Sequence, residues 1–363
     1  MRIAILFFGL ICYLIIVFFL LKLIINEFNI KKKRIVFCVG YSISCIPLFC
    51  ILDYIVRGIL FVEFMAYIGY LMLGFFIYYV LSLGLILVIK KGIFLLRKSN
   101  VFTNRFSIFL ASGISILICI YGILAAQMPE FTQQRLDLGL NQSMKITVVS
   151  DVHFGATGSF LSLEKMVQNI NKTNPDVILF IGDVFDNKVN NLNHSYFVDT
   201  LNQLRSRYGV YAVTGNHEFM QNSLQEIQEF YKGTNIHLLL DEEVIINDQL
   251  RVVGRIDYRG GRKELETIIS DTNLPLIVLD HQPQFYKEAK DLANLQISGH
   301  THNGQIFPGD ILIFLLNQIF FQSPSNGIHK YSDFVLAITR GYGTWGFPMR
   351  LTGRSQVMEF IID

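Results

Sequence analysis

Two kinds of hydrophobic pattern divide the chain near residue 128. Before this point, four mostly apolar runs of about 20 residues or more are separated by short polar segments. They lie at about 3–26, 35–56, 65–89 and 106–126. A run of this length can cross a hydrocarbon core of about 30 Å as an α-helix. We therefore expect residues 1–128 to form a region of four transmembrane helices.

The pattern changes from about Met144 onward. Short β-branched runs there alternate with polar segments that are compatible with helices, as is typical of strands followed by helices. We expect an α/β domain at 144–363 and a short linker at 129–143. A linker of this length should keep the second domain near the bilayer.

Composition and charge differ between the same two parts. Residues 1–128 contain 12 Lys and Arg against 3 Asp and Glu, a net charge of +9, whereas the rest contains 19 against 26, a net charge of −7. All five cysteines lie in the first part, without the spacing of a zinc site, and all eight histidines lie in the second. Any metal or acid–base chemistry is therefore expected after residue 128.

Basic residues predict the orientation of the membrane region. Residues 31–34 are all Lys or Arg and lie between the first two runs, and five more basic residues lie between the third and fourth runs. The positive-inside rule places both loops in the cytoplasm. The chain then leaves the fourth helix on the outer side, so we expect a multi-pass protein of the cell membrane with an extracytoplasmic second domain.

The first run could also be a signal peptide. It is longer than a typical signal-peptide core, and it ends at Asn26-Glu27 and a basic cluster rather than at a small-residue cleavage site. We expect it to be retained. The ionisable residues within the runs, Lys22 and Asp53, lie near the predicted helix ends, so no transport path is indicated.

Five short polar motifs follow apolar runs in the second part. They are Asp151-Val152-His153, Gly182-Asp183, Gly215-Asn216-His217-Glu218, Asp280-His281 and Gly299-His300-Thr301-His302. Open α/β sheets bind ligands at the carboxyl ends of their strands, where we expect these motifs to meet. A capped turn would explain most of them singly, and only the Asn-His pair favours function by itself. Taken together, their oxygen and nitrogen atoms suit Mn, Fe or Zn.

The spacing of the first three motifs supports this convergence. Asp183 follows Asp151 by 32 residues, and Asn216 follows Asp183 by 33. Each step is about the length of one strand–helix–strand crossover, so three successive units can end at one sheet edge.

The ordered set of motifs resembles that of the calcineurin-like metallophosphoesterases. The segments at 280–283 and 299–305 look closest to the membrane-associated bacterial branch. The resemblance covers residues 144–363 and not the apolar helices. It implies a metallophosphoesterase sandwich of two mixed β-sheets flanked by helices, with two divalent metal ions (Mn, Fe or Zn) as cofactors.

The same resemblance implies a role for each motif residue. One metal ion would be bound by Asp151, His153 and His302. The second would be bound by Asn216, His281 and His300. Asp183 would bridge the two ions, and His217 would be catalytic, stabilising the transition state or protonating the leaving oxygen.

For several other residues, the sequence allows both a functional and a purely structural interpretation. Asp186 and Glu218 could orient an imidazole or be solvated turn residues. Four arginines could contact phosphate through their guanidinium groups, although a solvated charge is the commoner explanation: Arg255, Arg259, Arg262 and Arg340. The remaining histidines lack motif context and are not expected to act: His194, His237 and His329.

The apolar run at 311–321 is too short to span a membrane. We expect it to be buried in the core, with membrane contact as the alternative. In that alternative the active site would face lipid headgroups, and a lipid-linked phosphate or pyrophosphate would be a plausible substrate.

The expected function is metal-dependent hydrolysis of a phosphoester or pyrophosphate bond by a membrane-anchored two-metal phosphoesterase, on a phosphorylated small molecule, a lipid-linked substrate or an envelope substrate. The alternative is a membrane sensor or binding protein with a decayed phosphoesterase domain, and the complete set of motif residues argues against decay. A net charge of −7 on the second part argues against a nucleic-acid partner.

Overall fold

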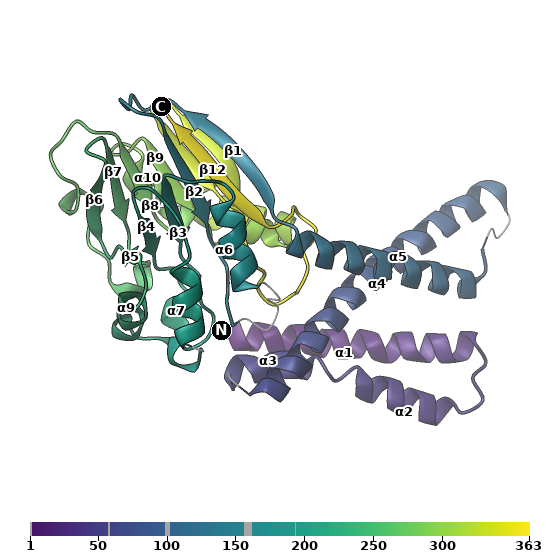
Figure 1. Cartoon of the computed structure of the whole chain (residues 1–363). Helices are drawn as coiled ribbons and strands as arrows, with labels where there is room; N and C mark the ends of the chain where they lie inside the picture. Colours follow the sequence, from purple (N-terminus) through teal and green to yellow (C-terminus); the bar gives the residue numbers. More distant parts are fainter. Residues whose placement is uncertain (1, 57–58, 99–101, 156–161, 193) are drawn as a thin grey trace. The chain divides into compact units, whose positions relative to one another are not determined.

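The computed structural model describes the chain except for residues 1, 57–58, 99–101, 156–161 and 193 (Figure 1). The chain forms two compact units. The first consists of Met1–Ile123 with Gly346–Pro348, and the second of Leu124–Trp345 with Met349–Asp363.

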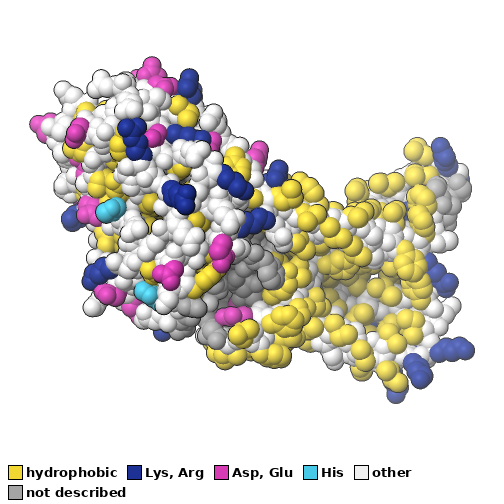
Figure 2. Space-filling model, viewed as in Figure 1, with side chains coloured by type: hydrophobic (Ala, Val, Ile, Leu, Met, Phe, Trp, Pro, Cys, Tyr) yellow, Lys and Arg dark blue, Asp and Glu magenta, His cyan; other side chains and the backbone are white. Residues whose placement is uncertain are grey.

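Apolar helices make up most of the first unit. They are α1 (Arg2–Glu27), α2 (Lys33–Ile43), α3 (Leu48–Ile55), α4 (Leu60–Arg97) and α5 (Asn104–Gln127), the last of which ends in the second unit. By length and composition, four segments among the described residues could cross a membrane: Phe7–Glu27, Lys33–Asp53, Leu60–Arg97 and Asn104–Gln127. Figure 2 shows hydrophobic side chains over these helices and Lys and Arg side chains near their ends.

Two of the expected helices have different limits. The second is divided into α2 and α3 by turns at 44–47, where Pro47 lacks the N–H group that would continue the helical hydrogen bonds. α4 runs from Leu60 to Arg97 rather than over 65–89. Its apolar pattern continues past Lys90 and Lys91, so these charges do not end the helix.

The second unit contains two six-stranded sheets. The first has the order β1 (Glu130–Leu136), β12 (Gln356–Ile362), β2 (Met144–Val149), β3 (Val177–Ile181), β4 (Val210–Val213) and β5 (Ile236–Leu238). The second has the order β10 (Gly327–Tyr331), β11 (Phe334–Ile338), β9 (Leu295–Ser298), β8 (Leu276–Leu279), β7 (Leu250–Gly254) and β6 (Glu242–Ile246). Both sheets are mixed. β2 to β5 are parallel while β12 is antiparallel to β2, and in the second sheet β6 and β10 are antiparallel edge strands.

Helices and short helical turns connect the strands. They are α6 (Leu163–Asn171), η1 (Val189–Asn191), α7 (His194–Leu201), α8 (Glu218–Gln221), α9 (Leu224–Lys232), η2 (Tyr258–Gly260), η3 (Leu265–Thr267), η4 (Pro283–Phe285), α10 (Tyr286–Ala289), η5 (His302–Gly304), α11 (Gly309–Leu316) and η6 (Asn317–Phe321). α6, α7 and α9 cover the outer face of the first sheet (Figure 1), where Met166, Phe180 and Phe230 belong to one buried hydrophobic cluster.

The main core lies between the two sheets. Ile146 and Leu179 of the first sheet and Ile277 and Ile297 of the second belong to one fully buried cluster. Because the central parallel strands are covered on both faces, they are almost continuously apolar. A sandwich of two mixed sheets flanked by helices is the fold expected from the sequence, and the prediction is confirmed.

The expected linker at 129–143 is different in the structure. β1 occupies Glu130–Leu136 and pairs in parallel with β12 over seven residues. β1 is an edge strand in which five of the seven residues are polar, so its sequence looked like a solvated connection. The prediction of a linker is therefore wrong for these residues.

Candidate metal centre

All eight predicted site residues follow strand ends. In the first sheet, β2 leads to Asp151 and His153, β3 to Asp183, and β4 to Asn216 and His217. In the second sheet, β8 leads to His281, and β9 to His300 and His302. A hydrogen bond joins the edges of the two sheets: His281 Nδ1 donates to the carbonyl oxygen of Ile181 at 2.7 Å. The structure thus gathers the five motifs at one place.

The strand ends approach one another closely. A Cβ atom on Gly182, whose φ is +73°, would lie 2.5 Å from the backbone nitrogen of Gly215. Only glycine fits such a contact. This approach brings the residues after β3 and β4 next to each other.

Backbone strain is concentrated in the motifs. Five of the eight residues have φ between +50° and +72°: Asp151, His153, Asp183, His300 and His302. Non-glycine residues rarely adopt this region, and each instance costs about 1–3 kcal/mol. Such strain persists where the surrounding structure holds side chains in a functional arrangement.

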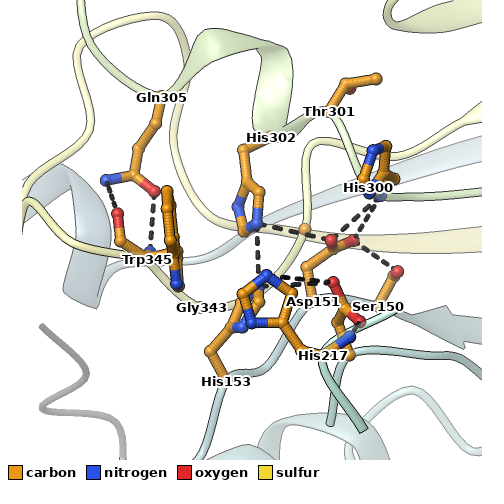
Figure 3. A network of polar contacts seen from close by, with 12 residues as sticks. Ser150, Asp151, His153, His217, His300, Thr301, His302, Gln305, Gly343 and Trp345 are labelled. Atoms are coloured by element: carbon orange, nitrogen blue, oxygen red, sulfur yellow. Dashed lines mark hydrogen bonds and ion pairs between the residues drawn. The ribbon is translucent and has the colours of Figure 1, made fainter. Parts of the chain in front are cut away.

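The first group of potential ligands consists of Asp151, His153 and His302. One ligand atom from each lies within 4.8 Å of the others. His302 Nε2 is 2.9 Å from His153 Nε2 and 3.4 Å from Asp151 Oδ1 (Figure 3). Ser150 Oγ donates to Asp151 Oδ2 at 2.5 Å and the His300 N–H donates to Oδ1 at 3.0 Å, which orients the carboxylate.

The second group consists of Asp183, His281 and His300, again with ligand atoms within 4.8 Å of one another. His281 Nδ1 donates to a carbonyl oxygen, which directs Nε2 toward Asp183 Oδ2, 3.0 Å away. Burial alone would lower the pKa of His281, but the carboxylate of Asp183 raises it above its ordinary value. Asn216 is adjacent to His217, whose N–H donates to Asp183 Oδ1 at 2.7 Å.

Two buried atoms test whether a metal ion fits. Asn216 Oδ1 has no hydrogen-bond partner, and His281 Nε2 faces Asp183 Oδ2 at 3.0 Å without the geometry of a hydrogen bond. A buried polar atom without a partner costs about 1–3 kcal/mol. Both are lone-pair atoms of the kind that binds Mn, Fe or Zn, so the residues fit a divalent cation.

Asp186 connects two imidazoles. Its Oδ1 atom accepts from His153 Nδ1 at 2.9 Å and from His217 Nδ1. The Nε2 atoms are therefore left to face the other ligands. This contact resolves the open interpretation of Asp186, which is 2% exposed and orients imidazoles rather than being a solvated turn residue.

Charges shift the pKa values of this pair in opposite directions. Burial alone would raise the pKa of Asp186, but His153 and His217 outweigh it and hold the pKa well below its ordinary value. Burial alone would lower the pKa of His217, but Asp183 and Asp186 raise it to about 9. With the protein's own charges alone, His217 is therefore cationic at neutral pH.

Glu218 holds the backbone of the site. Its carboxylate accepts from the N–H groups of Asp183 at 3.0 Å, Val184 at 2.5 Å, Phe185 at 3.1 Å and Gly215 at 2.8 Å. Burial, with the charge of Asp183, raises its pKa to about 7. Glu218 thus fixes the loops after β3 and β4 and does not orient an imidazole.

Arg350 is a supporting residue that the sequence did not reveal. It is fully buried, and it donates to the carbonyl oxygens of Arg340 at 2.7 Å and Gly343 at 2.6 Å. Its Nη2 atom also contacts His302 Nδ1 at 3.2 Å. Since a guanidinium group only donates, Nδ1 accepts and the neutral His302 carries its proton on Nε2. An ion bound at Nε2 would displace this proton.

Trp345 forms one wall of the site. Its ring centroid is 5.5 Å from that of His217. Gln305 accepts from the Trp345 N–H at 2.9 Å and donates to its carbonyl oxygen at 3.2 Å (Figure 3). Trp345 follows Arg340 by five residues, but no pattern in the sequence indicated contact with His217.

The four candidate arginines have different surroundings. Arg255 pairs with Asp241 and Glu288, Arg262 with Asp280 and Glu288, and Arg340 with Glu130. Arg259 Nη1 lies 3.4 Å from the carbonyl oxygen of Asn216. Within the described part of the chain, no carboxylate comes within 4 Å of its charge. Arg259 is therefore the best placed of the four to contact an anion.

The remaining histidines lie outside the potential ligand groups. His194 packs on Phe230, His237 on Tyr211, and His329 bonds to the carbonyl oxygen of Asn326. No group of potential ligands among the described residues includes them.

Comparison with known proteins gives the family. Residues 144–304 match the calcineurin-like phosphoesterase family. Proteins called "Transmembrane protein with metallophosphoesterase domain" are similar to this chain: that of Danio rerio is 30% identical over 278 residues, and that of Bos taurus 32% over 282 residues. Each alignment covers 70% of this chain and 62% of the relative.

Bacterial relatives are also similar. An uncharacterized metallophosphoesterase of Helicobacter pylori is 28% identical over 228 residues, covering 60% of this chain and 59% of that protein. The chain thus spans about three fifths of the length of these relatives. The motifs, the two-sheet sandwich and these similarities agree, and the chain carries a calcineurin-like metallophosphoesterase domain.

Proposed function

We propose that this chain is a membrane-anchored phosphoesterase that uses two metal ions to hydrolyse a phosphoester or pyrophosphate bond. The observation that carries the proposal is the pair of carboxylate–imidazole groups, Asp151–His153–His302 and Asp183–His281–His300, together with the buried Asn216 Oδ1, which has no hydrogen-bond partner. The family match supports phosphoester hydrolysis in general.

The ligands divide between the two ions as follows. Asp151, His153 and His302 would hold the first ion, and Asn216, His281 and His300 the second. Asp183 would bridge them, since its carboxylate contacts the second group and lies 4.0 Å from His153 Nε2 of the first. The nitrogen and oxygen donors suit Mn, Fe or Zn. Two such ions would polarise the phosphoryl oxygens and lower the pKa of a water molecule.

The protein's own residues would supply the remaining steps. His217, held at Nδ1 by Asp186, is placed to donate an Nε2 proton to the leaving oxygen. Arg259, beside Asn216, can bind a phosphoryl oxygen and orient the substrate.

The membrane part of the proposal rests on the helices and on charge. Four segments are long and apolar enough to span a membrane, and the relatives from Danio rerio and Bos taurus are called transmembrane proteins. By the positive-inside rule, the basic residues between the first two and the last two spans favour a catalytic domain outside the cytoplasm. Protease digestion of intact and permeabilised cells tests this: the catalytic domain should be cleaved in intact cells, and protection there would reverse the orientation.

Purified full-length protein in detergent tests the enzymatic claim. Manganese content should approach two ions per chain, and p-nitrophenyl phosphate or its bis ester should be hydrolysed. Asp183→Asn should abolish both properties. Asp199→Asn, an exposed carboxylate on α7, is the matched control. Metal binding without turnover of either ester would instead favour a sensor with a decayed domain.

A further inference from the structure

The helix after the last metal motif is apolar and exposed. α11 and η6 together cover Gly309–Phe321, and nine of these thirteen residues are Ile, Leu or Phe. None of the thirteen is buried, and the exposed fraction reaches 67% at Ile319 and 69% at Phe320. The expectation of core burial for residues 311–321 is therefore wrong.

The apolar side chains surround the helix. Residues 311–316 are all apolar, and five of the six are exposed. At about 100° per residue, six residues pass through more than one full turn. An amphipathic helix that docks into a protein groove presents one apolar stripe and a polar opposite face. α11 has no such polar face, so a surrounding apolar medium suits it better than a groove.

The length of the helix limits how deeply it could enter a membrane. Thirteen residues extend about 20 Å, less than the roughly 30 Å of a hydrocarbon core. The segment can therefore enter the boundary between headgroups and acyl chains, but it cannot cross the bilayer.

Both ends of the helix are attached to the catalytic domain. At its start, a Cβ atom on Gly304 would lie 2.2 Å from the backbone nitrogen of Asp310, and Gly304 follows His302 by two residues. At its end, Lys287 donates to Gln322 at 3.3 Å, and Ser323 donates to the carbonyl oxygen of Pro283 at 3.2 Å. Only the apolar middle of the segment is free of the core.

We propose that α11 and η6 insert into the surface of a lipid bilayer and hold the metal centre there. A membrane is the occupant indicated by the chain itself, because it has four segments that could span one. Exposed aromatic residues near the helix suit the same boundary, with Phe307 47% and Trp345 46% exposed. This inference concerns docking and stands whether or not the proposed phosphoesterase activity is found.

Tryptophan fluorescence of the full-length protein in lipid vesicles tests the proposal. Trp345 is the only tryptophan, so Trp345→Phe provides a dark background, and far-ultraviolet circular dichroism checks its fold. Phe320→Trp then reports on η6. Ile245→Trp, at a position on β6 that is 49% exposed, is the matched control.

Lipids brominated on the acyl chains should quench the F320W emission at least about twofold and leave I245W almost unchanged. Adding Ile319→Asp to the F320W reporter should reduce the quenching toward that of the control. Equal quenching of F320W and I245W would overturn the proposal. Emission at long wavelength would then mean water contact, and unquenched emission at short wavelength would mean that another helix or a second copy covers the segment.

Discussion

His217 Nδ1 donates a hydrogen bond to Asp186 Oδ1, and both side chains are buried at the metal centre. The bond fixes the direction of the imidazole and keeps its Nε2 atom toward Asp183, 4.0 Å away. Asp186 thus orients the proposed acid, and Asp183 and Asp186 together raise its pKa.

Asp186→Asn should lower kcat about 10- to 100-fold, as expected for loss of the group that orients an active imidazole. KM should change little, because Asp186 does not face the substrate. The check is a comparison of kcat and KM with Asp199→Asn as control. An equal effect of the two substitutions would contradict this role.

His217→Asn should lower kcat about 10²- to 10⁴-fold, the range of a general acid. Metal content should stay at the wild-type level, because His217 is proposed as an acid and not as a ligand. Metal analysis alongside kinetics separates the two roles. His194→Asn is the matched control, and loss of one ion from H217N would show that His217 is a ligand.

Arg259→Gln should raise KM about tenfold through loss of one charge-assisted contact to phosphate, with a smaller change in kcat. Arg262→Gln provides the contrast, since Arg262 pairs with Asp280 at 2.7 Å and Glu288 at 2.7 Å. R262Q should lower the thermal unfolding temperature instead. An unchanged KM in R259Q would remove Arg259 from the substrate site.

Removal of metal should lower the unfolding temperature of the wild-type protein. Ions that bind only the folded state stabilise it, and without them the buried Asn216 Oδ1 and His281 Nε2 form no hydrogen bond. Calorimetry with and without chelator measures the difference. His281→Ala should be much less sensitive to chelator, and equal sensitivity would argue that stabilising metal binds elsewhere.

The strand-end motifs were predictable from the sequence. The carboxyl ends of parallel strands lie at one edge of the sheet. The spacing of Asp151, Asp183 and Asn216 was therefore enough to predict that these residues lie close together. The histidines after β8 and β9 belong to another sheet, and their place depended on the family resemblance rather than on spacing. The structure brings all of them to one centre.

The supporting residues could not be predicted in the same way. Arg350 contacts His302, which is 48 residues away in the sequence, and Trp345 lies beside His217, which is 128 residues away. Such contacts depend on packing and leave no periodic pattern in the sequence. The apolar run at 311–321 was ambiguous for another reason, because its composition suits a buried core helix and a membrane surface equally well.

The ratio of bound metal to protein, measured together with phosphoester hydrolysis, tests the central claim most directly. Metal-free full-length protein should be titrated with Mn²⁺, and hydrolysis of p-nitrophenyl phosphate and its bis ester should be followed at each point. We expect activity to reach its maximum near two ions per chain and to be absent in Asp183→Asn. Full activity at one ion per chain, or in D183N, would contradict the two-metal centre.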